Sequence, residues 1–119
     1  MRRDLYEDEH RLFRRTAREF LAREVAPYHA QWERDGIVPR RVWKQAGELG
    51  LLGFSAPEEY GGAGITDFRY NAILTEEIMR IGATGLGFSL HNDMVAAYLV
   101  DLTTDEQKAR WLPGFASGE

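Results

Sequence analysis

The 119-residue chain contains no cysteine. It therefore has no disulfide framework, no thiolate metal site and no cysteine nucleophile, which fits the intracellular, cytoplasmic protein that we expect. Long apolar runs are missing too, because no segment approaches the ~20 apolar residues that a membrane span needs. The N-terminus "MRRDLYEDEH" is charged, unlike a signal peptide, so we expect a soluble protein with no membrane span.

Positive charge is not in excess. The 15 Lys and Arg residues face 19 Asp and Glu residues, which gives a formal net charge of −4. This balance argues against a nucleic-acid partner held mainly by phosphate contacts. The segment 2–26 is rich in Arg but interleaves Asp and Glu throughout, which favours a salt-bridged helix face over a basic binding patch.

Strand patterns are absent as well, because no segment alternates apolar and polar residues convincingly. Apolar residues instead recur at helical spacing, and the hydrophobic fraction of 44% is ordinary for a globular protein. The sequence therefore predicts an all-α fold, a helical bundle of about five to six helices in a single domain over residues 1–119. The predicted helical segments are 4–24, 27–36, 39–49, 66–81, 84–101 and 103–112.

Turn and capping residues set the expected helix ends. Thr66 is predicted to cap the helix that follows it, and Gly82 to end that helix. The last helix can begin with a capping box in either of two registers, Thr104 with Gln107 or Thr103 with Glu106. We expect this helix to fray at Pro113, since proline lacks the backbone N–H of an interior helical residue.

Most candidate chemistry has a simpler structural explanation, and no catalytic residue is assigned. The segment "YGGAG" follows no strand and lacks the spacing of a phosphate-binding loop, so it predicts a turn. The pairs Glu58–Glu59 and Glu76–Glu77 are predicted to be solvated charges, with Glu76 pairing with Arg80. Three histidines are far apart in sequence, so no metal site is expected at His10, His29 and His91.

The segment 84–101 carries the sharper signal, because its apolar residues spread around the whole helix axis. On one flank two polar side chains lie among large apolar ones, and that flank consists of Phe88, His91, Asn92, Val95 and Leu99. The opposite flank, with Leu86, Leu90 and Ala97, is predicted to pack into the core. A buried His and Asn need hydrogen-bond partners, which either protein atoms or a ligand would supply.

Five segments occur in an order that is informative as a whole. They are "FRRTAREFLAREVAP", "VWKQAGELGLLGFSAPEEYGGAG", "TEEIMRIGAT", "SLHN" and "DEQKARWLPGFASGE". In this order and spacing, from about Tyr6 to Glu119, the sequence resembles the N-terminal all-α domain of the acyl-CoA dehydrogenase flavoprotein family. The resemblance implies that a middle β-domain and a C-terminal α-bundle, which this chain lacks, belong to the parent protein.

The resemblance also implies an activity for that parent protein. Members of the family bind FAD and oxidise acyl-CoA thioesters across the α,β bond, are usually homo-oligomers, and commonly pass electrons to electron-transfer flavoprotein. Their catalytic base and most FAD contacts lie outside the N-terminal domain. We therefore expect the isolated chain to be inactive and not to retain FAD, and we assign no cofactor-binding residue within it.

By family position, the resemblance implies that five residues line the acyl cavity, namely Gly87, Phe88, His91, Asn92 and Val95. Because Phe88 and His91 are bulky, we expect them to shorten the cavity and to favour a short, branched or ring-bearing acyl group. Two alternatives stay open at this point. One is the N-terminal domain of a related acyl-CoA oxidase or flavin monooxygenase, and the other is a stand-alone helical interaction module.

Overall fold

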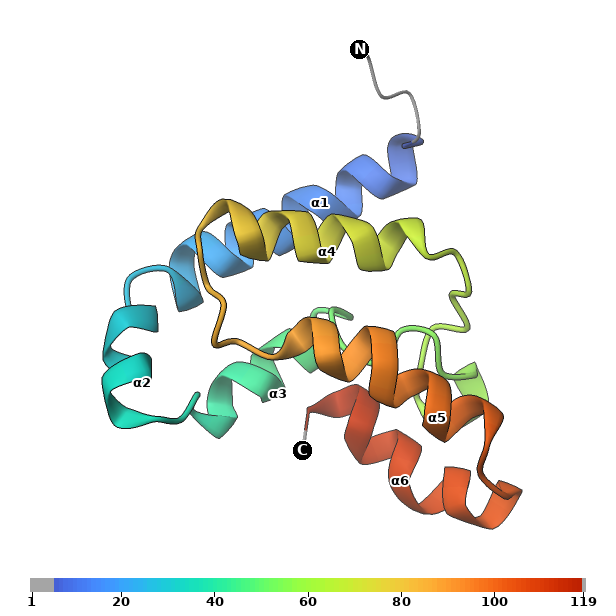
Figure 1. The fold of residues 1–119 in the computed structure, drawn as a ribbon. Coiled ribbons are helices and arrows are strands. Elements are labelled where there is room, and N and C mark those ends of the chain that lie inside the picture. The colour runs from blue at the N-terminus through green and yellow to red at the C-terminus, as the bar shows by residue number, and fades with distance from the viewer. Residues whose placement is uncertain (1–5, 119) are drawn as a thin grey trace. The chain divides into compact units, whose positions relative to one another are not determined.

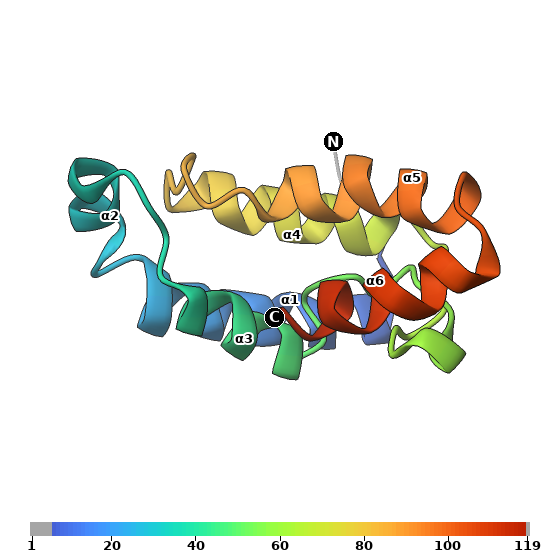
Figure 2. The ribbon, with the colours of Figure 1, turned by 90° about the horizontal axis from the view of Figure 1, so that it is seen from below.

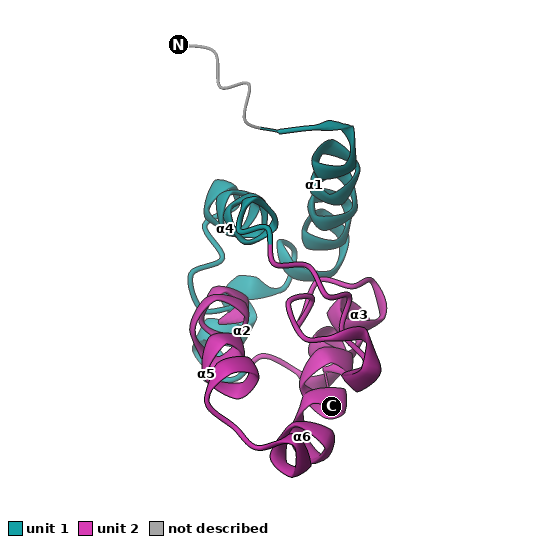
Figure 3. Cartoon of the chain, turned by 90° about the vertical axis from the view of Figure 1, so that its right-hand side faces the viewer, with its two compact units in different colours: residues 1–37, 67–86 teal, residues 38–66, 87–119 magenta. Residues whose placement is uncertain are grey.

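A computed structural model describes residues 6–118, and their contacts divide the chain into two compact units (Figure 3). The first unit comprises Met1–Ile37 and Asp67–Leu86, and the second comprises Val38–Thr66 and Gly87–Glu119. Across the described residues the regular structure is entirely helical, with six α-helices, two π-helical segments, one 3-10 turn and no strand. The predicted all-α class is therefore confirmed, and the single domain over residues 1–119 stays a prediction.

The first unit is built on two long helices that lie side by side, α1 (Asp8–Phe20) and α4 (Arg69–Arg80) (Figure 1). A π-helical segment, η1 (Leu21–Val25), continues α1, and α2 (His29–Asp35) follows. The predicted interruption before Pro27 is confirmed, because regular helix ends at Val25. The core of this unit is aliphatic and aromatic, and its buried side chains include Ala17, Phe20, Leu21, Val25, Ile73, Leu74 and Ile78.

The second unit packs α3 (Arg40–Glu48) against α6 (Asp105–Ser117). Along the chain between α3 and α6, this unit also contains the 3-10 turn η2 (Glu58–Tyr60), the π-helical segment η3 (Leu90–Val95) and α5 (Ala96–Asp101). The chain turns back after α5 so that α6 contacts it (Figure 2). Gln107 N donates to Thr104 Oγ1 at 3.2 Å and Thr104 N donates to Gln107 Oε1 at 2.9 Å, so the capping box uses the first of the two predicted registers.

Two predicted helix starts are wrong. Helix α4 begins at Arg69 rather than after Thr66, with Phe68 as its N-cap residue, and Asp67 Oδ1 accepts the Arg69 N–H at 3.0 Å just before the helix. Residues 84–87 form a turn instead of a first helical turn, and Gly87 adopts a φ of 79° that glycine tolerates without a side-chain clash. The helix predicted from Thr84 therefore begins at Phe88.

The predicted fraying at Pro113 is also wrong, since α6 continues to Ser117 and ends at Gly118 with a left-handed φ of 85°. Proline removes one backbone hydrogen bond. Leu112 and Ala116, on either side of Pro113, are buried, and Gly118 N donates to Gly114 O at 3.0 Å. Burial and the C-terminal cap thus keep the last turn helical.

The close approach of α3 to α6 depends on a glycine. A Cβ at Gly47 would lie 2.2 Å from the backbone oxygen of Ser117, and a rigid backbone cannot yield as a side chain would. We expect Gly47→Ala to lower the free energy of unfolding by about 2 kcal/mol, the usual range for overpacking. Urea unfolding of the two proteins measures this difference. Glu48→Ala, exposed on the same helix, is the control and should stay within about 0.5 kcal/mol of the parent.

No helix among residues 6–118 combines the length and the apolar character that crossing a bilayer requires.

Candidate functional site

Four of the five predicted substrate-binding residues lie on one helical element of the second unit, residues 88–101, which we call the wall helix, and Gly87 directly precedes it. Its middle part, Leu90–Val95, is π-helical, and Ala96 N donates to the carbonyl of His91 five residues earlier. Such segments are rare and occur frequently at functional sites. A π turn holds more residues than an α turn, so the flanks of the wall helix differ from those predicted with α-helical spacing.

Phe88 points into the core of its own unit. Its side chain is fully buried, and its ring centroid lies 4.7 Å from that of Trp43 in an edge-to-face arrangement. Aromatic rings prefer this geometry over a face-to-face sandwich. The Phe88 side chain therefore packs the start of the wall helix against the core of the second unit.

His91 is held in a ring stack. Its imidazole lies 3.6 Å from the Phe115 ring, centroid to centroid, with an interplanar angle of 7°, and 5.4 Å from the Trp43 ring. Because a carbonyl only accepts, His91 Nε2 donates the 3.0 Å hydrogen bond to Phe115 O. Burial lowers the pKa of His91, and the hydrogen bond to Phe115 offsets this only in part. The ring is therefore neutral at pH 7 and half-buried.

Asn92 is buried and clamps the loop that follows α3. Its Oδ1 accepts the Gly53 N–H at 2.9 Å, and its Nδ2 donates to the Leu51 carbonyl at 2.8 Å. The sequence left open whether protein atoms or a ligand would bond to this amide. Protein atoms supply partners at both of its ends.

The exposed part of the wall helix differs from the prediction. Of the flank predicted to pack into the core, Leu86 is buried as expected, but Leu90 is 57% exposed and Ala97 is exposed. Ala96 is buried instead, as the π-helical turn before it would produce. Of the five predicted substrate-binding residues, Gly87 and Val95 are exposed.

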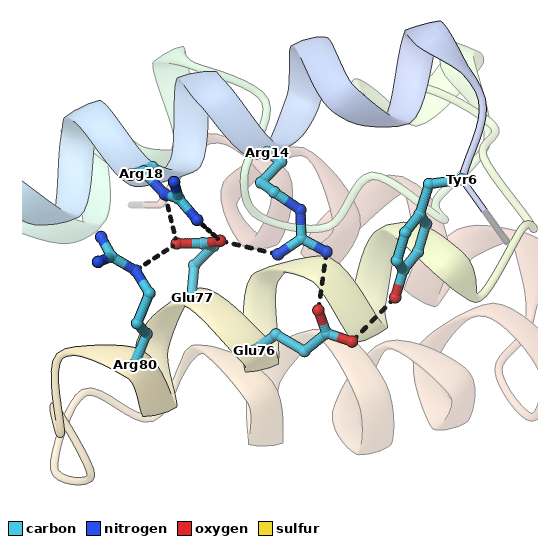
Figure 4. Close-up of polar contacts among 6 residues, drawn as sticks. All are labelled: Tyr6, Arg14, Arg18, Glu76, Glu77 and Arg80. Atoms are coloured by element: carbon cyan, nitrogen blue, oxygen red, sulfur yellow. Dashed lines mark hydrogen bonds and ion pairs between the residues drawn. The ribbon is translucent and has the colours of Figure 1, made fainter. Parts of the chain in front are cut away.

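A second cluster, in the first unit, joins α1 to α4 through a carboxylate that is 2% exposed (Figure 4). Glu77 Oε1 accepts from Arg14 at 2.7 Å and from Arg18 at 2.9 Å. Its Oε2 accepts from Arg18 at 3.0 Å and from Arg80 at 3.1 Å. Glu76 accepts from Arg14 at 2.7 Å and from the Tyr6 hydroxyl at 2.9 Å. We call these six residues the arginine cluster.

The arginine cluster corrects the prediction of two solvated carboxylates. Arg80 pairs with Glu77 instead of Glu76, and Glu77 is buried. Burial alone would raise the pKa of Glu77, but hydrogen bonds from Arg18, Arg14 and Arg80 hold it at about 2. Glu77 is thus ionised at neutral pH, and its role is to join the two helices.

A third group, at the start of α1, brings one possible metal-ligand atom each from Glu7, Glu9 and His10 within 4.8 Å of one another. Both ring nitrogens of His10 are engaged, because Glu7 N donates to Nδ1 at 3.0 Å and Nε2 lies 2.9 Å from Asp67 Oδ2. Hydrogen bonds from Arg69, together with that from His10, hold the pKa of Asp67 below its usual range. This group therefore fixes the α1 N-terminus to the turn before α4.

Comparisons with known proteins agree with this all-helical architecture. The family model described as "Acyl-CoA dehydrogenase, N-terminal domain" matches residues 7–119. The long-chain specific acyl-CoA dehydrogenase of Rattus norvegicus mitochondria is 40% identical over 117 residues, which are 98% of this chain and 27% of that protein.

Solved structures agree as well. An acyl-CoA dehydrogenase from Geobacillus kaustophilus has a TM-score of 0.89 and 39% identity, over 97% of this chain and 30% of that one. An acyl-CoA dehydrogenase from Bacillus anthracis complexed with FAD has a TM-score of 0.73 and 31% identity, over 99% of this chain and 20% of that one.

The fold and its loops thus define an all-α domain of the kind found in flavin-dependent acyl-CoA dehydrogenases. The chain belongs to the acyl-CoA dehydrogenase N-terminal domain family. It spans about a quarter of the length of the curated relatives that it matches, as the 27% coverage of the rat protein shows.

Proposed function

We propose that this chain is the N-terminal domain of a longer, FAD-dependent acyl-CoA dehydrogenase that oxidises the α,β bond of acyl-CoA thioesters. The observation that carries the proposal is the family match over residues 7–119, with similar solved structures over nearly the whole chain. FAD in such an enzyme accepts the hydride removed from the substrate.

The described residues do not suggest a flavin site of their own. Among the glycines of 60–64, a Cβ at Gly62 would lie 2.1 Å from the backbone oxygen of Ala56, so this glycine permits close packing of a turn. The β and C-terminal domains proposed for the longer protein are the proposed source of the FAD contacts and the catalytic base. Electron-transfer flavoprotein as acceptor, assembly into a homo-oligomer and a cytoplasmic location are further parts of the proposal.

The role proposed for this chain is to form one wall of the acyl pocket. Gly87 and Val95 offer exposed, uncharged surface, and His91 adds the edge of a neutral ring. Phe88 and Asn92 are proposed as positioning residues, since their side chains engage the rings and backbone behind the wall helix. A related acyl-CoA oxidase or flavin monooxygenase would use the same wall, so the acceptor has to be measured.

Flavin spectroscopy tests the proposal. We expect the full-length protein to bind FAD and its flavin absorbance to bleach when an acyl-CoA is added anaerobically. Recovery of absorbance with electron-transfer flavoprotein but not with oxygen would identify a dehydrogenase, and fast recovery with oxygen an oxidase or monooxygenase. The isolated 119-residue chain should remain colourless and inactive. One flavin bound per isolated chain would contradict the proposal that the other domains supply the FAD contacts.

A further inference from the structure

His29 is the one histidine whose contacts the proposed function does not explain, since His10 fixes the start of α1 and His91 belongs to the wall helix. It is the first residue of α2, and its side chain is 12% exposed. The Gly85 N–H donates to His29 Nε2 at 3.2 Å, although the two residues are 56 positions apart in sequence. Gly85 lies in residues 82–86, which we call the exit turn because the chain passes from it into the second unit. The hydrogen bond therefore joins α2 to the exit turn within the first unit.

This hydrogen bond depends on the protonation state of the His29 ring. A backbone N–H can only donate, so Nε2 has to be the accepting nitrogen and the neutral ring carries its proton on Nδ1. A protonated imidazole has two donors and no acceptor. His29 can therefore hold the Gly85 backbone only while its ring is neutral.

A carboxylate beside the ring offers the protonated form a different partner. Glu33 Oε1 lies 3.7 Å from His29 Nε2, the same nitrogen that accepts from Gly85. Among residues 6–118, Glu33 is the charged side chain within ion-pair distance of His29, and the exit turn contributes no titratable group. Glu33 is 55% exposed, so solvent screens the pair without removing it. Protonation thus exchanges one partner of Nε2 for another.

The exit turn is built so that this exchange affects only its middle. A Cβ at Gly85 would lie 3.3 Å from His29 Nε2, closer than ordinary van der Waals contact, so glycine lets the ring approach the backbone. Ala83 and Leu86 are buried on either side of this position, whereas Gly85 itself is exposed. Loss of the His29 hydrogen bond would therefore release Gly85 and leave the buried parts of the turn in place.

We propose that His29 is a proton-dependent anchor of the exit turn. The neutral ring holds the Gly85 backbone, and the protonated ring releases it and pairs with Glu33. Histidine is the side chain whose charge ordinarily changes between pH 5 and 8, so mild acid is enough to operate such an anchor. The inference uses contacts of the first unit alone and does not depend on the proposed acyl-CoA activity.

Hydrogen exchange of the full-length protein measures the anchor directly. Mass spectrometry with fragmentation resolves single amides, and protection factors remove the intrinsic effect of pH on exchange. From pH 8 to pH 5 the protection factor of the Gly85 amide should fall about threefold, toward the lower end of what one hydrogen bond contributes, because Gly85 is exposed. The Ala83 amide, which donates to Ile78 O at 3.1 Å, is the internal control and should keep its protection.

Three variants separate the acceptor from the charge. His29→Gln keeps an acceptor oxygen and does not titrate, so Gly85 should stay protected at both pH values. His29→Phe keeps an aromatic ring without an acceptor, so protection should be low at both. Glu33→Gln removes the carboxylate that favours the protonated ring, so the loss of protection should move to lower pH.

Several outcomes would overturn the proposal. One is a Gly85 protection factor that is the same at pH 8 and pH 5 in the wild type, and another is an equal fall in His29→Gln. An equal fall at Ala83 would mean that acid opens the whole unit instead of releasing the turn. A loss of protection at the same pH in Glu33→Gln would contradict the exchange of partners. None of these measurements requires acyl-CoA oxidation, so failure of the proposed activity would leave them unaffected.

Discussion

Glu77→Gln is expected to lower the free energy of unfolding by about 3 kcal/mol, because it removes the charge that the arginine cluster surrounds. The Glu77 carboxylate accepts four hydrogen bonds from three arginines and is 2% exposed. Hydrogen bonds to a charged group contribute more than neutral ones, and glutamine would turn an amide N–H₂ toward guanidinium donors.

Chemical denaturation at pH 7 measures this effect, and Glu76→Gln is the control beside it. Glu76 is 40% exposed and contacts Arg14 and Tyr6, so solvent screens its ion pair. The control should therefore cost less than about 1 kcal/mol. Equal losses in the two variants would mean that burial of Glu77 does not strengthen its interactions.

The Glu77 carboxylate also makes the free energy of unfolding depend on pH in the acidic range. The folded pKa of Glu77 is about 2, below its ordinary value of 4.5, so the folded state binds its proton less readily than the unfolded state. The stabilisation is therefore complete above pH 4.5 and is lost as the pH falls from 4.5 toward 2. Denaturation midpoints over this range should fall more steeply in the wild type than in Glu77→Gln, and parallel curves would contradict this assignment.

Local sequence patterns predicted the helices because apolar residues recur at helical spacing in each helical segment. The capping box at Thr104 was found by spacing, although two registers fitted equally well and the structure uses one. Pro113 shows where a local rule fails. Its missing N–H weakens one turn, but burial of Leu112 and Ala116 outweighs that loss, and local spacing does not reveal tertiary burial.

The arginine cluster could not be predicted for a similar reason. Glu77 meets Arg14 and Arg18 across 63 and 59 residues of sequence, whereas pair rules within a helix reach only three or four positions. A helical wheel instead paired Glu76 with Arg80. The available signal was the position of Glu77 on the buried stripe of α4, one residue before Ile78.

The flanks of the wall helix were misassigned because its geometry is not purely α-helical. A wheel at ~100° per residue placed Leu90 and Ala97 in the core. Residues 84–87 are not helical, and the π-helical segment over Leu90–Val95 places more residues in each turn, so α-helical spacing holds neither before nor after Leu90, and both positions are exposed. The acyl wall on this helix stays a proposal, and the structure shows which of the helix's side chains are exposed.

Asn92→Leu is expected to destabilise the chain by about 3 kcal/mol, although leucine is of similar size and apolar. The substitution leaves the Gly53 N–H and the Leu51 carbonyl without the partners that Asn92 supplies in a buried site. Each buried polar group that loses its partner costs about 1–3 kcal/mol. Met94→Leu, exposed on the same helix, is the control and should change stability by less than about 0.5 kcal/mol.

This substitution also separates the two roles open to Asn92. If its amide holds the loop at 51–53 behind the wall helix, Asn92→Leu lowers the unfolding midpoint of the isolated chain, where no acyl-CoA is needed. If the amide instead serves a ligand, the midpoint stays unchanged and only acyl-CoA affinity of the full-length protein falls. Because both ends of the amide are bonded to backbone atoms of its own unit, we expect the first result. Asn92 would then shape the proposed acyl wall without touching the acyl group.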